Sequence, residues 1–207
     1  MASFKDSLYG GLSGKIGPVT TYVRKGVQVV RANTKPRDTK TPKQLAHRMK
    51  FSMINKDLSP LNSAIKIGHN GDTDAYRTIV GKAYHEAIVG EYPNFTIDYS
   101  KIKIADGDLE LPADIEFEFD ESKNCALFKW HKQDNSSLKK ESGSDMLNIV
   151  CYNVKHGAVE QMSSVARRLE NNASVIIPKG WKPDDTHFWV YFSSHTLQMN
   201  SESLYIK

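Results

Sequence analysis

Seven histidines are the side chains of this 207-residue chain best suited to metal binding or general-base chemistry. They stand at His47, His69, His85, His131, His156, His187 and His195. None occurs in the HxH, HExxH or HxxE spacings that common metal centres use. We therefore expect surface or half-buried histidines, with no metal site and no cofactor.

Nucleophile and phosphate-loop patterns are missing as well. Ser13 lies among glycines at residues 10–14, but no helix pattern follows it, as a GxSxG nucleophile would require. Gly14 and Lys15 lack the GxxxxGK spacing of a phosphate-binding loop, and Pro18 with a strand pattern comes next. The sequence predicts no catalytic residue and favours a protein that is not an enzyme, with an enzyme left as an alternative.

Paired carboxylates offer a third kind of chemistry. Glu116 and Glu118 alternate with apolar residues at 115–119, and Asp184 and Asp185 follow Pro183. Strand alternation places both glutamates on the face opposite the apolar side chains. A solvated strand face is therefore favoured over glycosidase-like acid and base work.

The basic residues are distributed unevenly. Of the 28 Lys and Arg residues, eleven lie from Lys15 to Lys56, where Asp38 is the only one of the chain's 24 acids. A basic segment at 15–56 and an acidic remainder can meet between copies of the chain, or the segment can bind a polyanion. Tyr22 and Phe51 are its only aromatics, so stacking on single-stranded nucleic acid has little support. We therefore predict subunit contacts, with nucleic acid as the alternative, through Lys15, Arg24, Lys25, Arg31, Lys35, Arg37, Lys40, Lys43, Arg48 and Lys50.

The strands and helices predicted in the first half of the chain must position these basic residues. Residues 1–14 form a glycine-rich, flexible lead-in, and residues 19–23 and 27–31 predict a hairpin with Gly26 in its turn. An extended linker at 33–40 precedes a helix with Thr41 as N-cap and Pro42 at its first position. Its expected apolar stripe consists of Leu45, Met49 and Met53, widened by Phe51 and Ile54. Further helices are predicted at 61–67 and 74–89.

From residue 92 onward the apolar period changes to two. Short strands are predicted at 95–99, 102–104, 115–119, 125–130, 147–154, 174–177, 187–192 and 203–206. This spacing favours an antiparallel immunoglobulin/fibronectin-like β-sandwich with Trp130 buried. The predicted fold is therefore α+β, with a hairpin and helices at 1–105 and the sandwich at 106–207. Cys125 and Cys151 have no metal or disulfide spacing and are predicted to be reduced core thiols.

Compartment signals are few. The start of the chain carries Lys5 and Asp6 where a Sec signal would be apolar, and no apolar run approaches the roughly 20 residues of a membrane helix. We expect synthesis in the cytoplasm without a Sec signal and no membrane insertion, with the final location open.

Several ordered motifs carry a family resemblance. They are residues 11–19 (GLSGKIGPV), 24–31 (RKGVQVVR), 41–51 (TPKQLAHRMKF) and 58–60 (LSP), with later landmarks at Trp130, Asp145, Arg167, Pro178 and residues 201–205. Together they resemble a domain-of-unknown-function family of about this length in Bacteroidota, which implies no activity or cofactor. Residues 41–51 are also similar to a segment of phage-type virion and tail proteins.

These observations favour a non-enzymatic structural subunit that assembles with copies of itself into a filament, ring or virion-like particle. A nucleic-acid-binding accessory protein is the first alternative. The second is a surface or carbohydrate-binding sandwich, for which exposed aromatics such as Trp181 or Trp189 would be the mark.

Overall fold

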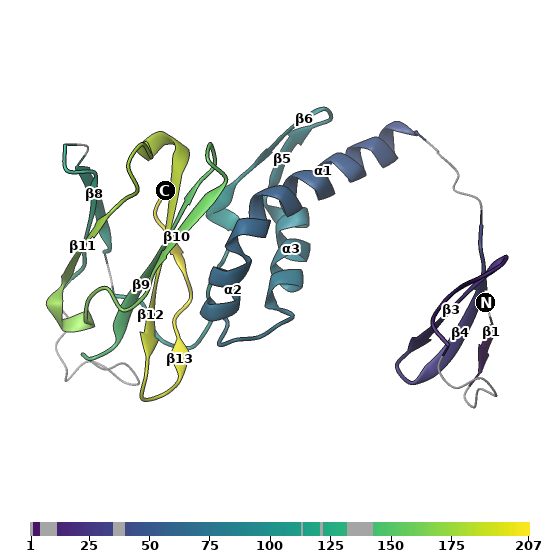
Figure 1. Cartoon of the computed structure of the whole chain (residues 1–207). Helices are drawn as coiled ribbons and strands as arrows, with labels where there is room; N and C mark the ends of the chain where they lie inside the picture. Colours follow the sequence, from purple (N-terminus) through teal and green to yellow (C-terminus); the bar gives the residue numbers. More distant parts are fainter. Residues whose placement is uncertain (1, 5–11, 35–39, 113, 121, 132–142) are drawn as a thin grey trace. The chain divides into compact units, whose positions relative to one another are not determined.

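The computed structural model describes residues 2–4, 12–34, 40–112, 114–120, 122–131 and 143–207. The chain divides into two compact units, Met1–Thr41 and Pro42–Lys207 (Figure 1). We call them the N-terminal unit and the main unit.

The N-terminal unit is a four-stranded antiparallel sheet. Its strand order is β1 (Ala2–Phe4), β4 (Val27–Ala32), β3 (Val19–Arg24) and β2 (Gly14–Ile16). The predicted hairpin is confirmed, because β3 and β4 pair through a two-residue turn in which Lys25 has φ 50° and Gly26 has φ 75°. Two positive φ angles give the turn the twist of the strands. The expected flexible lead-in is wrong for Ala2–Phe4, which pair with β4. Residues 5–11 lie outside the described part.

The main unit begins with its helices, α1 (Pro42–Leu58), α2 (Asn62–Gly68) and α3 (Ala75–Glu86), with a 3-10 turn (Ser59–Leu61) before α2. The predicted helix start at Pro42 is confirmed. The expected stripe is confirmed for Ile54, which α1 buries together with Leu58, and is wrong for Met49 and Phe51, which are exposed. Helix α3 ends earlier than predicted, since the next residues form a hairpin of β5 (Ile88–Glu91) and β6 (Asn94–Ile97).

Two antiparallel sheets follow. One has the order β10 (Ala158–Met162), β9 (Met146–Asn153), β12 (Thr186–Ser194), with β13 (Met199–Asn200) and β14 (Leu204–Tyr205) both paired to β12. The other has the order β11 (Asn172–Ile176), β8 (Cys125–Lys129), β7 (Glu116–Asp120). These pairings correspond to the two sheets of a fibronectin-type sandwich. The predicted α+β fold is confirmed, although residues 102–104 form no strand and β10 was not predicted.

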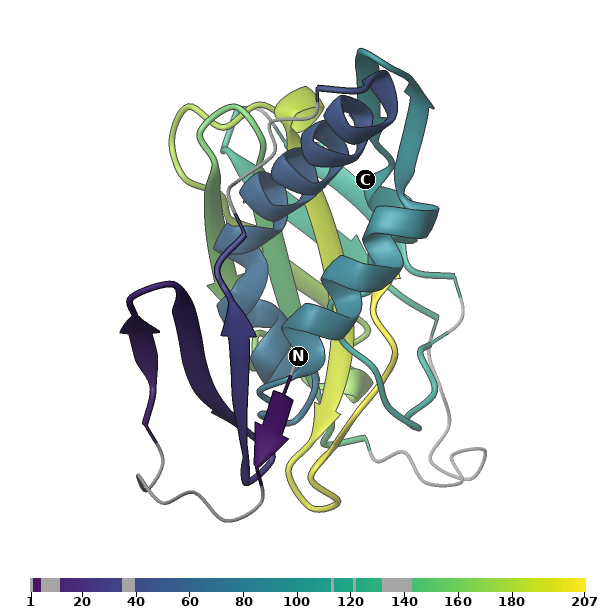
Figure 2. The same ribbon diagram turned by 90° about the vertical axis from the view of Figure 1, so that its right-hand side faces the viewer.

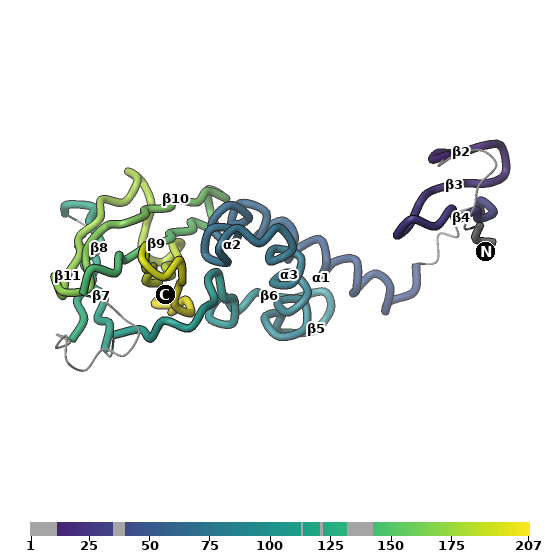
Figure 3. The backbone as a smooth tube through the Cα atoms, turned by 90° about the horizontal axis from the view of Figure 1, so that it is seen from below, coloured from purple at the N-terminus to yellow at the C-terminus, as the bar shows by residue number. Residues whose placement is uncertain are grey.

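Three layers result, with a core on each side of the five-stranded sheet (Figure 3). Along β12, Trp189 and Tyr191 face the helices, whereas Phe188, Val190 and Phe192 face the three-stranded sheet. Figure 2 shows α1–α3 in front of the five-stranded sheet. We predicted a boundary near residue 105. The helices and the five-stranded sheet share a core across that position, and the two compact units divide between Thr41 and Pro42.

Candidate assembly surfaces

One face of the N-terminal sheet is basic. The antiparallel register places Lys15, Thr20 and Arg31 in one row across β2, β3 and β4. The next rows along the same face pair Tyr22 with Val29 and Arg24 with Val27. We call these seven residues the basic face. Lys15, Arg24 and Arg31 are exposed there, and the described residues of this unit include no acid that would offset their charge.

The same unit buries little. Among its described residues, Val29 is the one buried hydrophobic side chain, at 7% exposure, while Leu12, Ile16 and Val23 are exposed. The other buried side chains, Thr21 and Gln28, are polar. Gln28 Nε2 donates to the Leu12 carbonyl over 2.7 Å. Polar contacts of this kind therefore accompany a small amount of apolar packing in this sheet. Sheets gain stability from a second packed layer, which the described part of the unit lacks.

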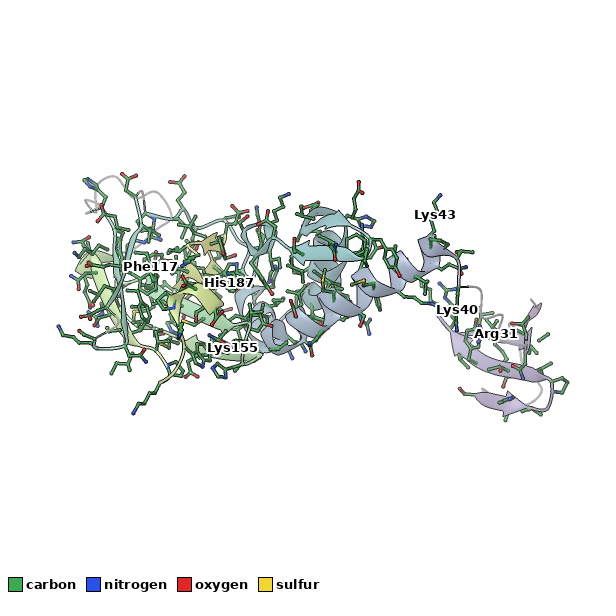
Figure 4. The ribbon with its side chains drawn as sticks, turned by 90° about the horizontal axis from the view of Figure 1, so that it is seen from above. Arg31, Lys40, Lys43, Phe117, Lys155 and His187 are labelled. Carbon is green, nitrogen blue, oxygen red and sulfur yellow. The ribbon has the colours of Figure 1, made fainter. Side chains whose placement is uncertain are left out.

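The remaining predicted contact residues are divided between the units. Arg31 belongs to the N-terminal sheet and Lys43 to the first turn of α1, where its side chain points into solvent (Figure 4). Lys50 Nζ lies 4.7 Å from the centre of the Phe95 ring, a cation–π contact between α1 and β6. Lys25 lies in the β3–β4 turn, and Lys40 and Arg48 are exposed before and on α1. Lys35 and Arg37 lie outside the described residues.

A second candidate surface is the outer face of the three-stranded sheet. Strand alternation turns Phe117 and Phe128 into the core and leaves nine side chains pointing outward. They are Glu116, Glu118, Asp120, Cys125, Leu127, Lys129, Asn172, Ser174 and Ile176, which we call the bare face. The prediction that Glu116 and Glu118 lie on a solvent face is confirmed.

Ile176 is the unexpected member of the bare face, because this large aliphatic side chain is 79% exposed. Leu127 and Cys125 are half-buried beside it, and an open depression of about 470 Å³ lies over Leu127, Glu116, Glu118 and Lys129. We did not identify these residues as functional from the sequence. The sequence did contain a signal for the exposure of Ile176, because strand alternation with Val175 and Ile177 turns its side chain to the opposite face. Cys125 is therefore not a core thiol, whereas Cys151 is buried; both are free.

The chain segment that leads into the bare face and forms its strand β7 is acidic. Residues 106–120 contain seven acids and no Lys or Arg: Asp106, Asp108, Glu110, Asp114, Glu116, Glu118 and Asp120. A hydrogen bond from the Ser122 hydroxyl, helped by the backbone amide and charge of Lys123, lowers the pKa of Asp120. This carboxylate therefore stays ionised at neutral pH. On the bare face the acids line the outer strand β7, Leu127 lies on the middle strand, and Ile176 lies at a corner on the other outer strand, β11.

A polar aromatic cluster joins the helices to the sandwich. Tyr99 Oη donates to Asp57 over 2.7 Å, and the Tyr99 ring stacks on His187 with 4.0 Å between centroids. His187 Nδ1 lies 2.8 Å from Tyr205 Oη. Burial lowers the pKa of His187 and raises the pKa of Tyr152 to about 12. These groups satisfy one another, and among the described residues no three His, Cys, Asp or Glu side chains gather as a metal site would need.

The tryptophans that would have marked a carbohydrate-binding sandwich are internal. Trp181 is 9% exposed, and Trp189 is fully buried with its Nε1 donating to the Ile102 carbonyl over 2.8 Å. The two residues named for that alternative therefore present no exposed ring. Among the described helices, none combines the length and apolar character needed to cross a bilayer.

Comparison with known proteins places the chain in a family. Residues 11–207 match the family model described as a family of unknown function, DUF6266. The chain belongs to DUF6266. The DUF6266 match includes β2, β3 and β4 as well as the whole main unit, which confirms the expected resemblance to an uncharacterised family over nearly the whole chain. No curated protein and no solved structure matches the chain.

Proposed function

We propose that this protein is a non-enzymatic structural subunit that assembles with copies of itself through the N-terminal unit. The observation that carries the proposal is the basic face on a sheet with a single buried hydrophobic residue among its described side chains. A sheet of this kind is stabilised when another surface supplies a second layer. The partner surface must be acidic at its rim to complement Lys15, Arg24 and Arg31.

A second copy of the chain meets this requirement. The main unit carries the acidic stretch at 106–120, so the chain holds both a positive and a negative surface. A filament, a ring and a virion-like particle are all compatible with contacts of this kind.

The test is self-association of the purified full-length chain. Light scattering and negative-stain microscopy at low salt should give ordered particles larger than the 23.3 kDa monomer. Screening by salt should reduce their mass, because exposed charges interact over ~10 Å at 0.1 M ionic strength. A chain that stays monomeric at every concentration and at low salt contradicts the proposal.

A charge-matched pair of variants identifies the surface. Lys15→Glu/Arg31→Glu reverses two cations in one row of the basic face and should abolish assembly. Lys179→Glu/Lys182→Glu makes the same change in net charge at two exposed lysines of the main unit and should leave assembly intact. Equal loss in both variants would mean that only total charge matters, against a specific basic face.

Nucleic acid is a second candidate partner, favoured by five cations and no acid in the described residues of the N-terminal unit, namely Lys15, Arg24, Lys25, Arg31 and Lys40. Fluorescence anisotropy with a labelled single-stranded oligonucleotide tests it. Binding that weakens steeply with salt, in a chain that remains monomeric without nucleic acid, would favour this second function.

A further inference from the structure

The two sheets of the sandwich are covered unequally. The five-stranded sheet packs helices on one face and the three-stranded sheet on the other (Figures 1 and 3). On the bare face, by contrast, Glu116, Glu118, Lys129, Ser174 and Ile176 are all exposed in the described structure. This sheet therefore has one packed face and one open face. Ile176, 79% exposed, lies in the same row as half-buried Cys125 and one row from half-buried Leu127, so the open face carries apolar surface as well as its acids.

The basic face and the bare face are complementary in chemistry. The basic face has half-buried Tyr22 and Val27 between cations, and the bare face has Leu127 beside Glu118, with Ile176 in the next row. Each is an antiparallel sheet face of short strands. Two such faces can pack about 10 Å apart, as sheets do inside a sandwich. Each would supply the layer that the other lacks.

The length of the connection favours a contact between different copies. Residues 33–41 join Ala32 to Pro42, and nine residues span at most about 30 Å when fully extended. Within the main unit, the first turn of α1 lies at the end opposite to the three-stranded sheet (Figures 1 and 3). The path to the bare face follows α1, which is about 25 Å long for 17 residues. It then crosses two layer spacings of about 10 Å each.

We propose that the basic face of one copy docks on the bare face of the next. This inference rests on the proposed function and names the surface that receives the N-terminal unit. Opposite charges bring Lys15, Arg24 and Arg31 against Glu116 and Glu118, while Tyr22 and Val27 cover Ile176 and Leu127. Because the two faces differ, the contact is head-to-tail and produces an open polymer or a closed ring.

The contact area is modest. Three strands of five residues give the bare face dimensions of about 17 Å by 14 Å. Standard interfaces bury about 800 Å² per partner, so a single contact here is weak and depends on its charges. Assembly should therefore increase with protein concentration and decrease with salt.

The experiment reverses the charges of each face in the full-length chain. Glu116→Lys/Glu118→Lys changes the bare face, and Lys15→Glu/Arg31→Glu changes the basic face. Each variant alone should sediment at the 23.3 kDa monomer mass under conditions in which the unmodified chain assembles. Mixed in equal amounts, the two variants should assemble again, since each then meets an oppositely charged face.

Matched controls separate this contact from general charge effects. Glu91→Lys/Glu160→Lys makes the same change in net charge on exposed residues of β5 and β10, outside the bare face, and should assemble like the unmodified chain. Ile176→Ser removes the most exposed apolar side chain of the bare face without changing its charge and should lower the assembled mass at a given concentration. Thermal unfolding of each variant shows whether the main unit remains folded.

The outcomes distinguish the two proposals. If the unmodified chain never assembles, the proposed function fails. If it assembles and Lys15→Glu/Arg31→Glu abolishes assembly, while Glu116→Lys/Glu118→Lys and Ile176→Ser do not alter it, the function stands and the bare face is not the receiving surface. Failure of the two charge variants to assemble when mixed also overturns the pairing of these faces, provided that both are folded.

Discussion

His187 links protonation to stability at the junction of helices and sheet. Burial and the nearby charge of Lys207 lower its pKa, against a smaller opposing effect of Asp57. The unfolded chain, with an ordinary histidine pKa near 6.5, therefore takes up a proton first as the pH falls. The contribution of His187 to stability is complete above that pKa and is lost on acidification.

We expect the free energy of unfolding in urea to fall between neutral and mildly acidic pH, and His187→Gln to reduce that fall. His195→Gln, at an exposed position, is the control and should leave the pH dependence unchanged. A pH dependence identical in His187→Gln and the unmodified chain would contradict this account.

Arg168 and Asp145 form a buried ion pair in the sandwich. Arg168 Nε lies 3.4 Å from Asp145 Oδ2, both side chains are 1% exposed, and the guanidinium lies 4.5 Å from the Phe192 ring centre. Arg168 Nη2 also donates to the Glu110 carbonyl over 2.9 Å. Replacing Arg168 by Met leaves Asp145 without its buried cation, which costs about 3–5 kcal/mol.

Denaturant unfolding measures this loss for Arg168→Met, and Asp145→Asn/Arg168→Met should recover part of it. If the double variant is as unstable as Arg168→Met, the cost arises from lost packing on Phe192 rather than from an uncompensated carboxylate.

At the scale of elements, two glycines of the helical layer should respond in opposite directions. A Cβ on Gly68 would lie 2.2 Å from the Ile104 carbonyl oxygen and 2.8 Å from the Ala105 Cβ, so Gly68→Ala forces the end of α2 away from this segment. Such overpacking costs about 1–3 kcal/mol. Gly81 is exposed within α3 and a Cβ there meets nothing within 4 Å, so Gly81→Ala should add about 1 kcal/mol of stability.

Thermal or denaturant unfolding of both variants tests this pair. Similar stabilities for Gly68→Ala and the unmodified chain would show that the end of α2 can move without loss.

Elements with local signals could be predicted from the sequence, and elements fixed by tertiary contacts could not. The Lys25–Gly26 turn and the helix start at Pro42 depend on neighbouring residues, and both predictions are confirmed. The buried side of α1 depends on what packs against it: of the predicted stripe, Ile54 meets the core but Met49 does not. The unpredicted strand β10 depends on its pairing with β9, and the predicted strand at residues 102–104 has no strand partner.

The candidate surfaces divide in the same way. Charge is visible in a sequence, so the basic residues and the solvent-facing Glu116 and Glu118 could be predicted. The bare face could not, because its membership depends on β11 pairing with β8, which lies more than 40 residues earlier in the chain. The predicted boundary near residue 105 lies inside the main unit for a related reason: Tyr152 and Trp189 of the sandwich share a core with α1–α3.

For the whole molecule, the two units should differ in local stability. The main unit has two apolar cores, whereas the described part of the N-terminal unit has one buried valine. Backbone amides in weakly packed regions open and exchange hydrogen more readily than those in a core. In the full-length Glu116→Lys/Glu118→Lys variant, which we expect to be monomeric, β3 and β4 should therefore exchange faster than β9 and β12.

The same amides should be protected in the assembled chain, because the bare face of a neighbour then covers Tyr22 and Val27 of the N-terminal sheet. Hydrogen–deuterium exchange with mass spectrometry, comparing peptides over β3 and β4 with peptides over β9, measures both states. Equal protection of β3 and β4 in the monomeric variant and in the assembly would mean that the N-terminal sheet is stable without a second layer, and the physical reason for docking it on another copy would be lost.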